Sequence, residues 1–248
     1  MRPQLKTVLL AIIISGSALG IGFCAYLYLG LPDVTDLQTQ NPRTTALMLQ
    51  RYRQARNEGK KMVVRQQWVA FERIPKLLKD AVRISEDAGF YQHQGLDFTE
   101  LKIALKQNWQ KGGYVRGAST ITQQLAKNLY LSTNKTIVRK VKELFITMRL
   151  EKQLDKNRIF ELYLNVIELG PGVFGVQAAA QYFFHKDVDR LNLEEIVRLT
   201  AVIPKPLQVS AAGNDRWLKW KAGWILDKLS KYKYIDRRQY HTAIAFFR

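Results

Sequence analysis

The chain has 248 residues, and its 39 Lys and Arg against 21 Asp and Glu give a formal net charge of +18. This length allows one membrane segment and one domain of ordinary size, and a hydrophobic content of 47% is enough to build a core. The charge indicates an anionic partner, such as a nucleic acid, a membrane surface or a phosphate-bearing substrate. A single cysteine, Cys24, excludes an internal disulfide, and three histidines without HxxxH or HExxH spacing argue against a zinc site.

An uncharged and almost wholly apolar run extends from Val8 to Leu29. It is long enough to cross a bilayer as a helix, and the basic residues Arg2 and Lys6 before it predict a cytoplasmic N-terminus. A cleaved signal peptide is the alternative, but its apolar core would be shorter and would end in a small-x-small site. The sequence therefore predicts a cytoplasmic N-terminus at 1–7, a transmembrane anchor at 8–29, a linker at 30–42 and one domain at 43–248.

Helical patterns dominate this domain. The spacing of apolar residues predicts helices over 43–58, 76–86, 135–153, 157–168, 176–184, 215–232 and 236–247. Three more helices are expected behind the capping pairs Asp97 with Glu100, Thr120 with Gln123, and Asn192 with Glu195. Only residues 62–71 show a weak tendency to be extended, so we expect an all-α domain with little or no sheet.

The stretch from Arg83 to Gly95 is the first candidate for chemistry. Glu86, Phe90 and His93 stand at i, i+4 and i+7, which would place them on one face of a helix. A carboxylate beside an aromatic ring and an imidazole can lose part of its hydration and act as a general base. The plain alternative is an exposed acidic turn at the end of an amphipathic helix, and this stretch alone favours that alternative.

Two helices carry tryptophan on one face. The helix behind Asp97 presents Leu101, Ala104, Leu105 and Trp109, with Lys102 and Lys106 beside them. This pattern is typical both of a core helix and of a helix that rests on a membrane surface, and the two interpretations weigh evenly. In the helix at 215–232, the stripe of Trp217, Trp220 and Trp224 is expected to pack against the core.

Three kinds of polar side chain recur in the middle of the domain. They are the carboxylates Glu86 and Glu143, the neutral hydrogen-bonding residues Ser119, Thr120, Gln123, Gln124 and Asn128, and the cations Lys127, Lys135, Arg139 and Lys140. Paired carboxylates with neutral hydrogen-bonding groups suggest glycosidic-bond chemistry. A hydrolase would protonate a sugar leaving group, whereas a transferase with a phosphate-activated donor needs cations or a metal. The cations favour the transferase, although Arg139 and Glu143 at i and i+4 can also form a plain surface salt bridge.

Five segments between residues 70 and 206 form ordered motifs. Residues 86–95 match EDxxFxxHxG, 117–128 match GxSTITQQxxKN, 139–143 with 150–151 match RKxxE…LE, and 156–165 are similar to KxxILExYLN. The fifth comprises 178–183 with Leu191, Leu193 and Glu195. Together they resemble the family 51 peptidoglycan glycosyltransferases, and no penicillin-binding transpeptidase segment follows them, as in monofunctional biosynthetic members. Lys135, Thr147 and His185 depart from the residues usual in that family.

The resemblance implies a lysozyme-like helical fold and lipid II as the membrane-embedded substrate. Glu86 would be the general base for the acceptor 4-hydroxyl, so that a β-1,4 bond forms with inversion and undecaprenyl diphosphate leaves. Glu143 would assist near the diphosphate, and a divalent metal ion, Mg or Mn, is the expected cofactor there. Lys127 and Lys135 would hold the diphosphate, Arg139 and Lys140 would position Glu143, and Ser119, Thr120, Gln123, Gln124 and Asn128 would contact the substrate.

These inferences define the expected partners and the alternatives. The partners are lipid II, the nascent glycan strand, the membrane and other cell-wall synthesis or division proteins, at a bacterial inner membrane with the domain in the periplasm. A lysozyme-like hydrolase and a non-enzymatic anchored scaffold are the competing functions. Nucleic-acid binding is disfavoured, because the aromatic residues do not interleave with the basic ones.

Overall fold

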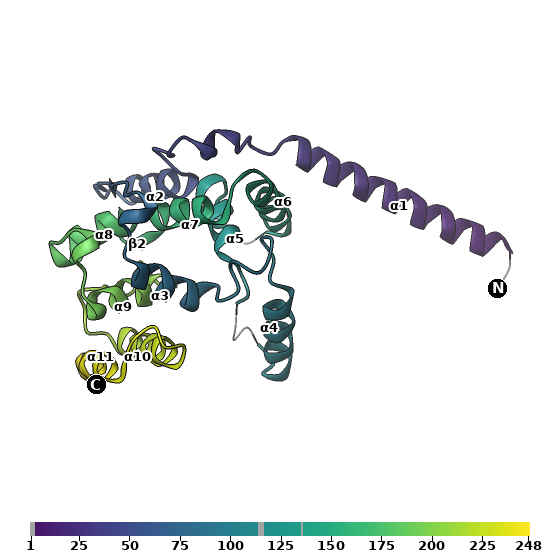
Figure 1. Cartoon of the computed structure of the whole chain (residues 1–248). Helices are drawn as coiled ribbons and strands as arrows, with labels where there is room; N and C mark the ends of the chain where they lie inside the picture. Colours follow the sequence, from purple (N-terminus) through teal and green to yellow (C-terminus); the bar gives the residue numbers. More distant parts are fainter. Residues whose placement is uncertain (1–2, 114–116, 135) are drawn as a thin grey trace.

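The computed structural model describes residues 3–113, 117–134 and 136–248, with the side chains of 3–13 and 19 left undescribed. The domain is mostly helical (Figure 1). The helices are α1 (Pro3–Leu29), α2 (Ala46–Asn57), α3 (Lys76–Glu86), α4 (Phe98–Gln110), α5 (Ile121–Tyr130), α6 (Ile137–Gln153), α7 (Lys156–Val166), α8 (Val176–Phe184), α9 (Leu193–Val202), α10 (Arg216–Lys231) and α11 (Arg237–Ile244). The short 3-10 helices are η1 (Thr35–Gln38), η2 (Phe71–Arg73), η3 (Val188–Arg190) and η4 (Ala245–Phe247), and the strands are β1 (Arg65–Gln66), β2 (Glu168–Gly170) and β3 (Val173–Phe174).

The predicted helix starts are confirmed at their caps. The Asp97 carboxylate accepts the backbone N–H of Glu100 at the start of α4. Thr120 and Gln123 form a reciprocal capping box at α5, and Asn192 and Glu195 form another at α9. These side chains satisfy N–H groups that a helix start otherwise leaves without partners. The caps therefore set where α4, α5 and α9 begin.

The helical domain contains one small sheet, in agreement with the expectation of little or no sheet. Its strand order is β1-β3-β2, with β1 parallel and β2 antiparallel to β3. The predicted helix at 157–168 ends at Val166, where the chain turns into the β2–β3 hairpin. Asn165 holds the other side of this region, because its side chain accepts the N–H of Val69 and donates to the Val69 carbonyl. The sheet therefore ties residues 65–69 to the end of α7.

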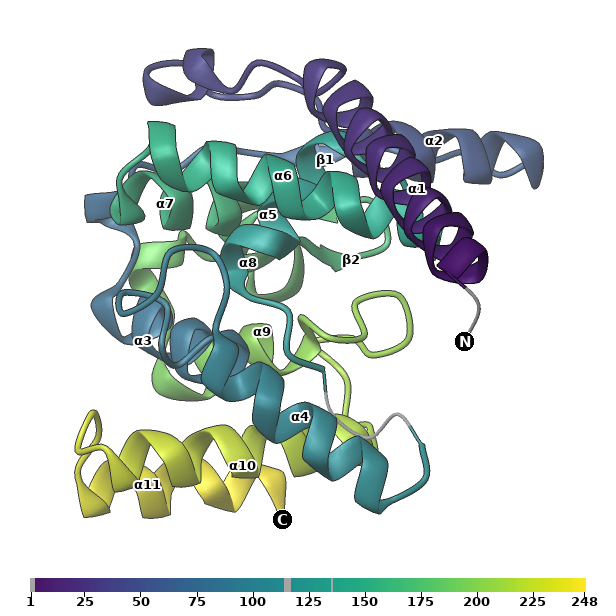
Figure 2. The same ribbon diagram turned by 90° about the vertical axis from the view of Figure 1, so that its right-hand side faces the viewer.

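Helix α7 lies at the centre of the core, as its apolar sequence predicts. Its buried side chains are at most 1% exposed and are Ile159, Phe160, Leu162, Tyr163, Leu164, Asn165 and Val166. Helix α5 packs against both α6 and α7, and α3 packs against α9 and α10. Figures 1 and 2 show these two groups of helices as adjoining layers, with α4 standing away from them.

The predicted tryptophan stripe of α10 is only partly in the core. Trp217 and Trp224 pack against the core from partly buried positions. Trp220 is 58% exposed, and its ring lies against Trp217 with a centroid distance of 4.9 Å. The expectation that all three rings face the core is therefore wrong for Trp220.

Helix α1 extends away from the domain (Figure 1). Its last turn is held by α6, because the Arg149 guanidinium donates to the carbonyls of Tyr28, Leu31 and Pro32. Arg149 also lies over the Tyr28 ring, and that ring packs edge-on against Phe145. Among the residues that the structure describes, no helix is both long enough and apolar enough to cross a membrane. The anchor at 8–29 stays a prediction.

The turn that closes the small sheet yields a stability prediction. Gly175 has φ +81° and a Cβ there would lie 2.5 Å from the Asn165 carbonyl oxygen, whereas Gly59 has φ +67° and open space around it. Gly59→Ala should lower the free energy of unfolding by about 1–2 kcal/mol through backbone strain alone. Gly175→Ala should lower it by a further ~1–3 kcal/mol, since the backbone around Asn165 must also move. Chemical denaturation followed by circular dichroism compares the two variants, and equal losses would contradict the steric argument.

Candidate active site

Glu86 is the last residue of α3, and both of its carboxylate oxygens accept hydrogen bonds. The Ser85 hydroxyl donates to Oε1 at 3.1 Å, and the Gln124 amide of α5 donates to Oε2 at 3.2 Å. The Glu86 side chain is half-buried. Neutral donors therefore hold the carboxylate while part of it stays accessible, which suits a general base.

The expected alignment of Glu86, Phe90 and His93 on one helix face is wrong. Helix α3 ends at Glu86, and the backbone leaves the helix at Asp87 with φ −162° and ψ 78°. The Phe90 side chain instead fills the core beneath the turn, where it is fully buried. The imidazole of His93 faces Asp87 rather than Glu86.

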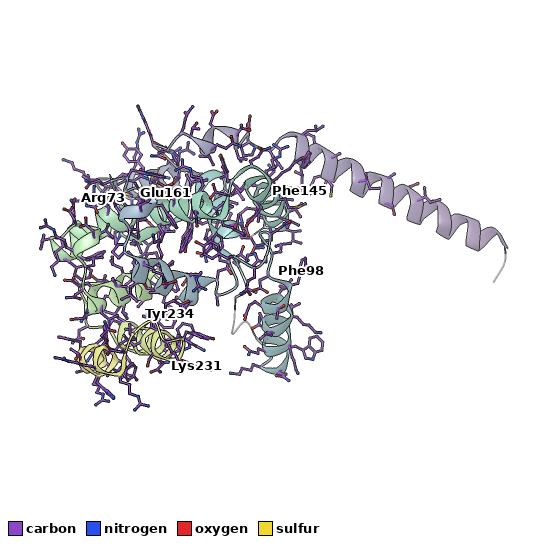
Figure 3. The ribbon with its side chains drawn as sticks, in the orientation of Figure 1. Arg73, Phe98, Phe145, Glu161, Lys231 and Tyr234 are labelled. Carbon is purple, nitrogen blue, oxygen red and sulfur yellow. The ribbon has the colours of Figure 1, made fainter. Side chains whose placement is uncertain are left out.

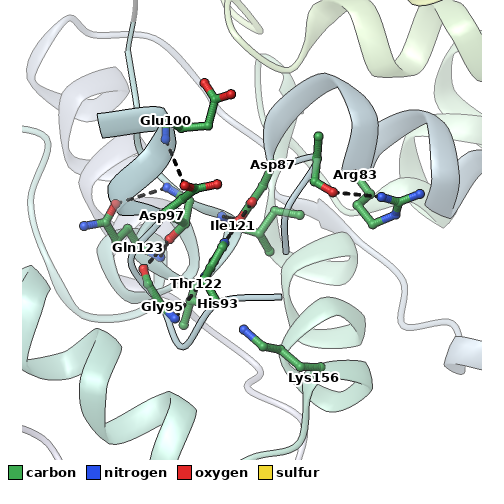
Figure 4. Close-up of polar contacts among 12 residues, drawn as sticks. Arg83, Asp87, His93, Gly95, Asp97, Glu100, Ile121, Thr122, Gln123 and Lys156 are labelled. Atoms are coloured by element: carbon green, nitrogen blue, oxygen red, sulfur yellow. Dashed lines mark hydrogen bonds and ion pairs between the residues drawn. The ribbon is translucent and has the colours of Figure 1, made fainter. Parts of the chain in front are cut away.

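Asp87 joins this turn to the start of α5 (Figure 4). Its carboxylate accepts the backbone N–H of Ile121 at 3.0 Å and lies 2.9 Å from His93 Nε2. Because the N–H of Gly95 donates to His93 Nδ1, the proton of the neutral ring sits on Nε2 and points at Asp87. The Thr120 hydroxyl makes a second link by donating to the Gly95 carbonyl at 2.7 Å.

Asp87, His93 and Asp97 offer ligand atoms within 4.8 Å of one another. These atoms already have partners, since His93 donates to Asp87 and Asp97 accepts the N–H of Glu100. A cation here would displace the proton that the Gly95 hydrogen bond places on Nε2. The cluster is therefore a hydrogen-bonded support for Glu86 and α5.

The predicted substrate residues on and before α5 fall into two groups. Ser119 is exposed, and Gln124 and Lys127 are half-buried. Thr120, Gln123 and Asn128 are buried, and the side chains of Thr120 and Gln123 form the capping box of α5. Lys135, another predicted ligand of the diphosphate, lies outside the described residues.

Glu143 is a buried carboxylate of α6 that faces several cations. Arg139 Nη1 lies 2.5 Å from Oε2, and the Lys140 ammonium pairs with Oε1. The plain alternative of a surface salt bridge does not apply, because the Glu143 side chain is only 4% exposed. Burial lowers the pKa of Lys127, and the negative charge of Glu143 acts in the opposite direction. Lys127 of α5 therefore belongs to the same cluster.

The surroundings of Glu143 do not fit the expected Mg or Mn ion. Both carboxylate oxygens are engaged by Arg139 and Lys140. Among the described residues, Glu143 belongs to no group of carboxylate, histidine and cysteine side chains close enough to share an ion. A divalent cation would also meet the positive charges of Lys127, Arg139 and Lys140 at short range.

One segment of α5 contacts both Glu86 and the cluster around Glu143. Gln124 and Lys127 are one turn apart, so a rise of about 4.5 Å separates the residue that contacts Glu86 from the residue that faces the Glu143 cluster. A family model described as Transglycosylase matches residues 53–230, which include this whole arrangement. The chain belongs to the transglycosylase family.

Curated members of the transglycosylase family match most of the chain. A biosynthetic peptidoglycan transglycosylase of Laribacter hongkongensis is 43% identical over 204 residues, which cover 82% of this chain and 85% of that protein. A protein of the same name from Methylobacillus flagellatus is 45% identical over 182 residues, covering 73% and 80%. A crystal structure of penicillin-binding protein 1A from Haemophilus influenzae aligns with a TM-score of 0.42 and 19% identity, covering 73% of this chain and 17% of that chain.

Two residues of this transglycosylase site were not predicted from the sequence. Tyr163 donates its buried hydroxyl to the Gln124 carbonyl oxygen at 3.0 Å. Burial lowers the pKa of Lys221 on α10, and the charge of Glu86 raises it, which places this ammonium near Glu86. Tyr163 has the appearance of a core aromatic, and only the packing of α10 on α3 brings Lys221 to the site.

The desolvated Lys127 yields a prediction about stability and pH. Burial holds its folded-state pKa below the ordinary 10.5, so the unfolded chain binds this proton more readily and wild type is penalised at neutral pH. Lys127→Met should therefore raise the melting temperature at pH 7, and the gain should shrink as the pH rises toward 10.5. Differential scanning calorimetry at pH 7 and pH 10 measures this. The exposed Lys152→Met of α6 is the control, and a lower melting temperature for Lys127→Met at pH 7 would contradict the assignment.

Proposed function

We propose that this chain is a peptidoglycan glycosyltransferase that polymerises lipid II into linear β-1,4 glycan strands. The main observation in support is that α5 connects an accessible carboxylate, Glu86, with the cation cluster around Glu143. A base and a cluster of cations are what glycosyl transfer from a diphosphate donor needs. The names of the curated relatives support this assignment.

The geometry supports an inverting mechanism. Glu86 takes the proton from the 4-hydroxyl of the acceptor sugar while that oxygen attacks the anomeric carbon of the donor. The bond from this carbon to the diphosphate oxygen breaks, and undecaprenyl diphosphate leaves with the electron pair. The cations Lys127, Arg139 and Lys140 stabilise the charge on the departing oxygens, which removes the need for a proton donor.

Glu143 distinguishes this transferase from a hydrolase on a similar helical, lysozyme-like fold. A hydrolase needs a carboxylic acid that can protonate the sugar leaving group. Both oxygens of Glu143 are engaged by Arg139 and Lys140, so neither is free for that task. We assign Glu143 to holding these cations where the diphosphate leaves, in place of the metal expected from the resemblance.

We also propose that α1 anchors the enzyme in the bacterial inner membrane, with residues 1–7 in the cytoplasm and the domain in the periplasm. The uncharged run from Val8 to Leu29 and the basic residues before it support this topology.

Helix α4 offers further support, because Phe98, Leu105 and Trp109 are 70%, 61% and 89% exposed. Figures 1 and 2 show α4 on the side of the domain from which α1 projects, and Figure 3 labels Phe98 and Phe145 there. The exposure of these apolar side chains therefore favours a helix that rests on the membrane surface over a core helix.

The catalytic assignment is tested by replacing the base. Glu86→Gln keeps the size and the hydrogen-bonding ability of the side chain but cannot take a proton, so polymerisation of labelled lipid II should fall by at least about 100-fold. Detergent-solubilised full-length protein and a gel of the glycan products give the measurement. The exposed Glu72→Gln of η2 is the matched control and should form long strands. Full activity of Glu86→Gln would contradict the proposal, and degradation of added glycan strands by wild type would indicate a hydrolase instead.

The membrane assignment is tested with cysteine labelling. Cys24 is the single cysteine of the chain and its side chain is exposed in the structure. In lipid vesicles it should resist a water-soluble maleimide, because the bilayer covers α1. With Cys24→Ser as background, Trp109→Cys should also be protected in vesicles, whereas Tyr52→Cys of α2, 51% exposed in wild type, should react fully. Rapid labelling of Cys24 would overturn the anchor, and equal labelling of both introduced cysteines would overturn the role of α4.

A further inference from the structure

The buried hydroxyl of Tyr163 takes part in a short chain of hydrogen bonds that ends at Glu86. Tyr163 lies on α7 with no exposed surface. Its hydroxyl donates to Gln124 Oε1 at 3.0 Å, and Gln124 Nε2 donates to Glu86 Oε2 at 3.2 Å. The Gln124 side chain thus lies between a core tyrosine and the accessible carboxylate.

The two ends of the Gln124 amide are chemically opposite. The NH₂ end only donates hydrogen bonds, and the carbonyl end only accepts them. A carboxylate accepts only, so it is stabilised by the NH₂ end and repelled by the carbonyl end. If the amide turned over, its carbonyl would face Glu86 and would favour the protonated carboxyl group, which is useless as a base.

Tyr163 is suited to keep the amide in the productive orientation. Burial raises the pKa of Tyr163 well above its ordinary value, and the charges of Glu86 and Asp87 raise it further. The hydroxyl therefore keeps its proton throughout the working range and can donate it to the carbonyl end of Gln124. A phenylalanine at this position would occupy the same space without this donor.

We propose that Tyr163 is a positioning residue, which holds the Gln124 amide so that its NH₂ end faces Glu86 and keeps that carboxylate available as the general base. This role rests on the proposed function of Glu86. It also changes the interpretation of Gln124, which was expected to contact the substrate. In the structure, Gln124 uses both ends of its amide on protein partners.

Other polar groups around Glu86 come from several elements. Ser85 of α3 donates to Oε1, and Lys221 of α10 contributes a nearby positive charge. Asp87 is the next residue, and its charge is engaged by His93 and by the Ile121 N–H. In the described part of the chain, the side-chain hydrogen bonds of Gln124 go to Glu86 and Tyr163. Replacing Tyr163 therefore changes one hydrogen-bond partner of that amide and leaves the hydrogen bonds of Ser85 and Asp87 in place.

The test is the pH dependence of lipid II polymerisation by full-length Tyr163→Phe in detergent. Without the tyrosine donor the amide is free to turn its carbonyl toward Glu86, so the acidic limb of kcat/KM should move to higher pH by about one unit. The rate on the alkaline side should stay close to wild type, because the carboxylate is then ionised in both proteins. Tyr240→Phe of α11 also loses one tyrosine hydrogen bond, to Asp227 at 2.7 Å, and its profile should match wild type.

A double-mutant cycle separates positioning from a merely structural effect. Gln124→Met should itself move the acidic limb upward, since it removes the donor to Glu86. Adding Tyr163→Phe to Gln124→Met should then cause no further movement, because the tyrosine acts only through the amide. If Tyr163→Phe folds poorly, Gln124→Met alone gives the comparison, and an acidic limb that does not move in this variant would overturn the proposal. An additional movement of the limb in the double variant would overturn the proposal.

The failure of this inference can be told from the failure of the proposed function. If Glu86→Gln is inactive and Tyr163→Phe has the wild-type pH profile, the positioning role is overturned and the base assignment stands. If Glu86→Gln retains full activity, the proposed function is overturned, and the positioning role is overturned with it.

Discussion

The site depends on the hydrogen bond between the Asp87 carboxylate and the backbone N–H of Ile121. Hydrogen bonds to a charged group contribute about 1.5–3 kcal/mol, roughly twice the value for neutral pairs. Asp87 follows directly after Glu86, and Ile121 is the first residue of α5, so one contact sets the end of α3 against the start of α5. Gln124 is then one turn along α5 and reaches Glu86. His93 supports this contact by donating its ring proton to the same carboxylate.

Local signals explain why much of the fold could be predicted. The bounds of α3 and α8 agree with the sequence prediction, and the capping boxes at Thr120 and Asn192 mark where α5 and α9 begin. A cap works within four residues, so the sequence contains all of its partners. The weak extended tendency at 62–71 covers β1, but β2 and β3 were not predicted. These strands have only two or three residues, and the pairing of the sheet depends on distant contacts such as Asn165 with Val69.

The site was predictable where the sequence spacing carries the geometry and unpredictable where packing does. Arg139 and Glu143 meet because they stand one turn apart on α6. The prediction that Glu86, Phe90 and His93 share one helix face was wrong because α3 ends at Glu86. Phe90 and His93 lie beyond the helix, where the i+4 and i+7 spacing no longer places residues on one face. Lys221 approaches Glu86 from a helix more than a hundred residues further along the chain, and no local pattern in the sequence can show this.

The two carboxylates of the site differ in the partners that surround them. Glu143 is buried between a guanidinium and an ammonium group, and its charge is used to hold cations at one place. Glu86 is held by a hydroxyl and an amide, which are neutral donors and leave its charge uncompensated by direct ion pairing. Both oxygens of Glu143 are engaged by cations, so neither is free to take a proton from a substrate hydroxyl. The same functional group therefore serves as electrostatic support in one place and as a candidate base in the other, and α5 sets the distance between them.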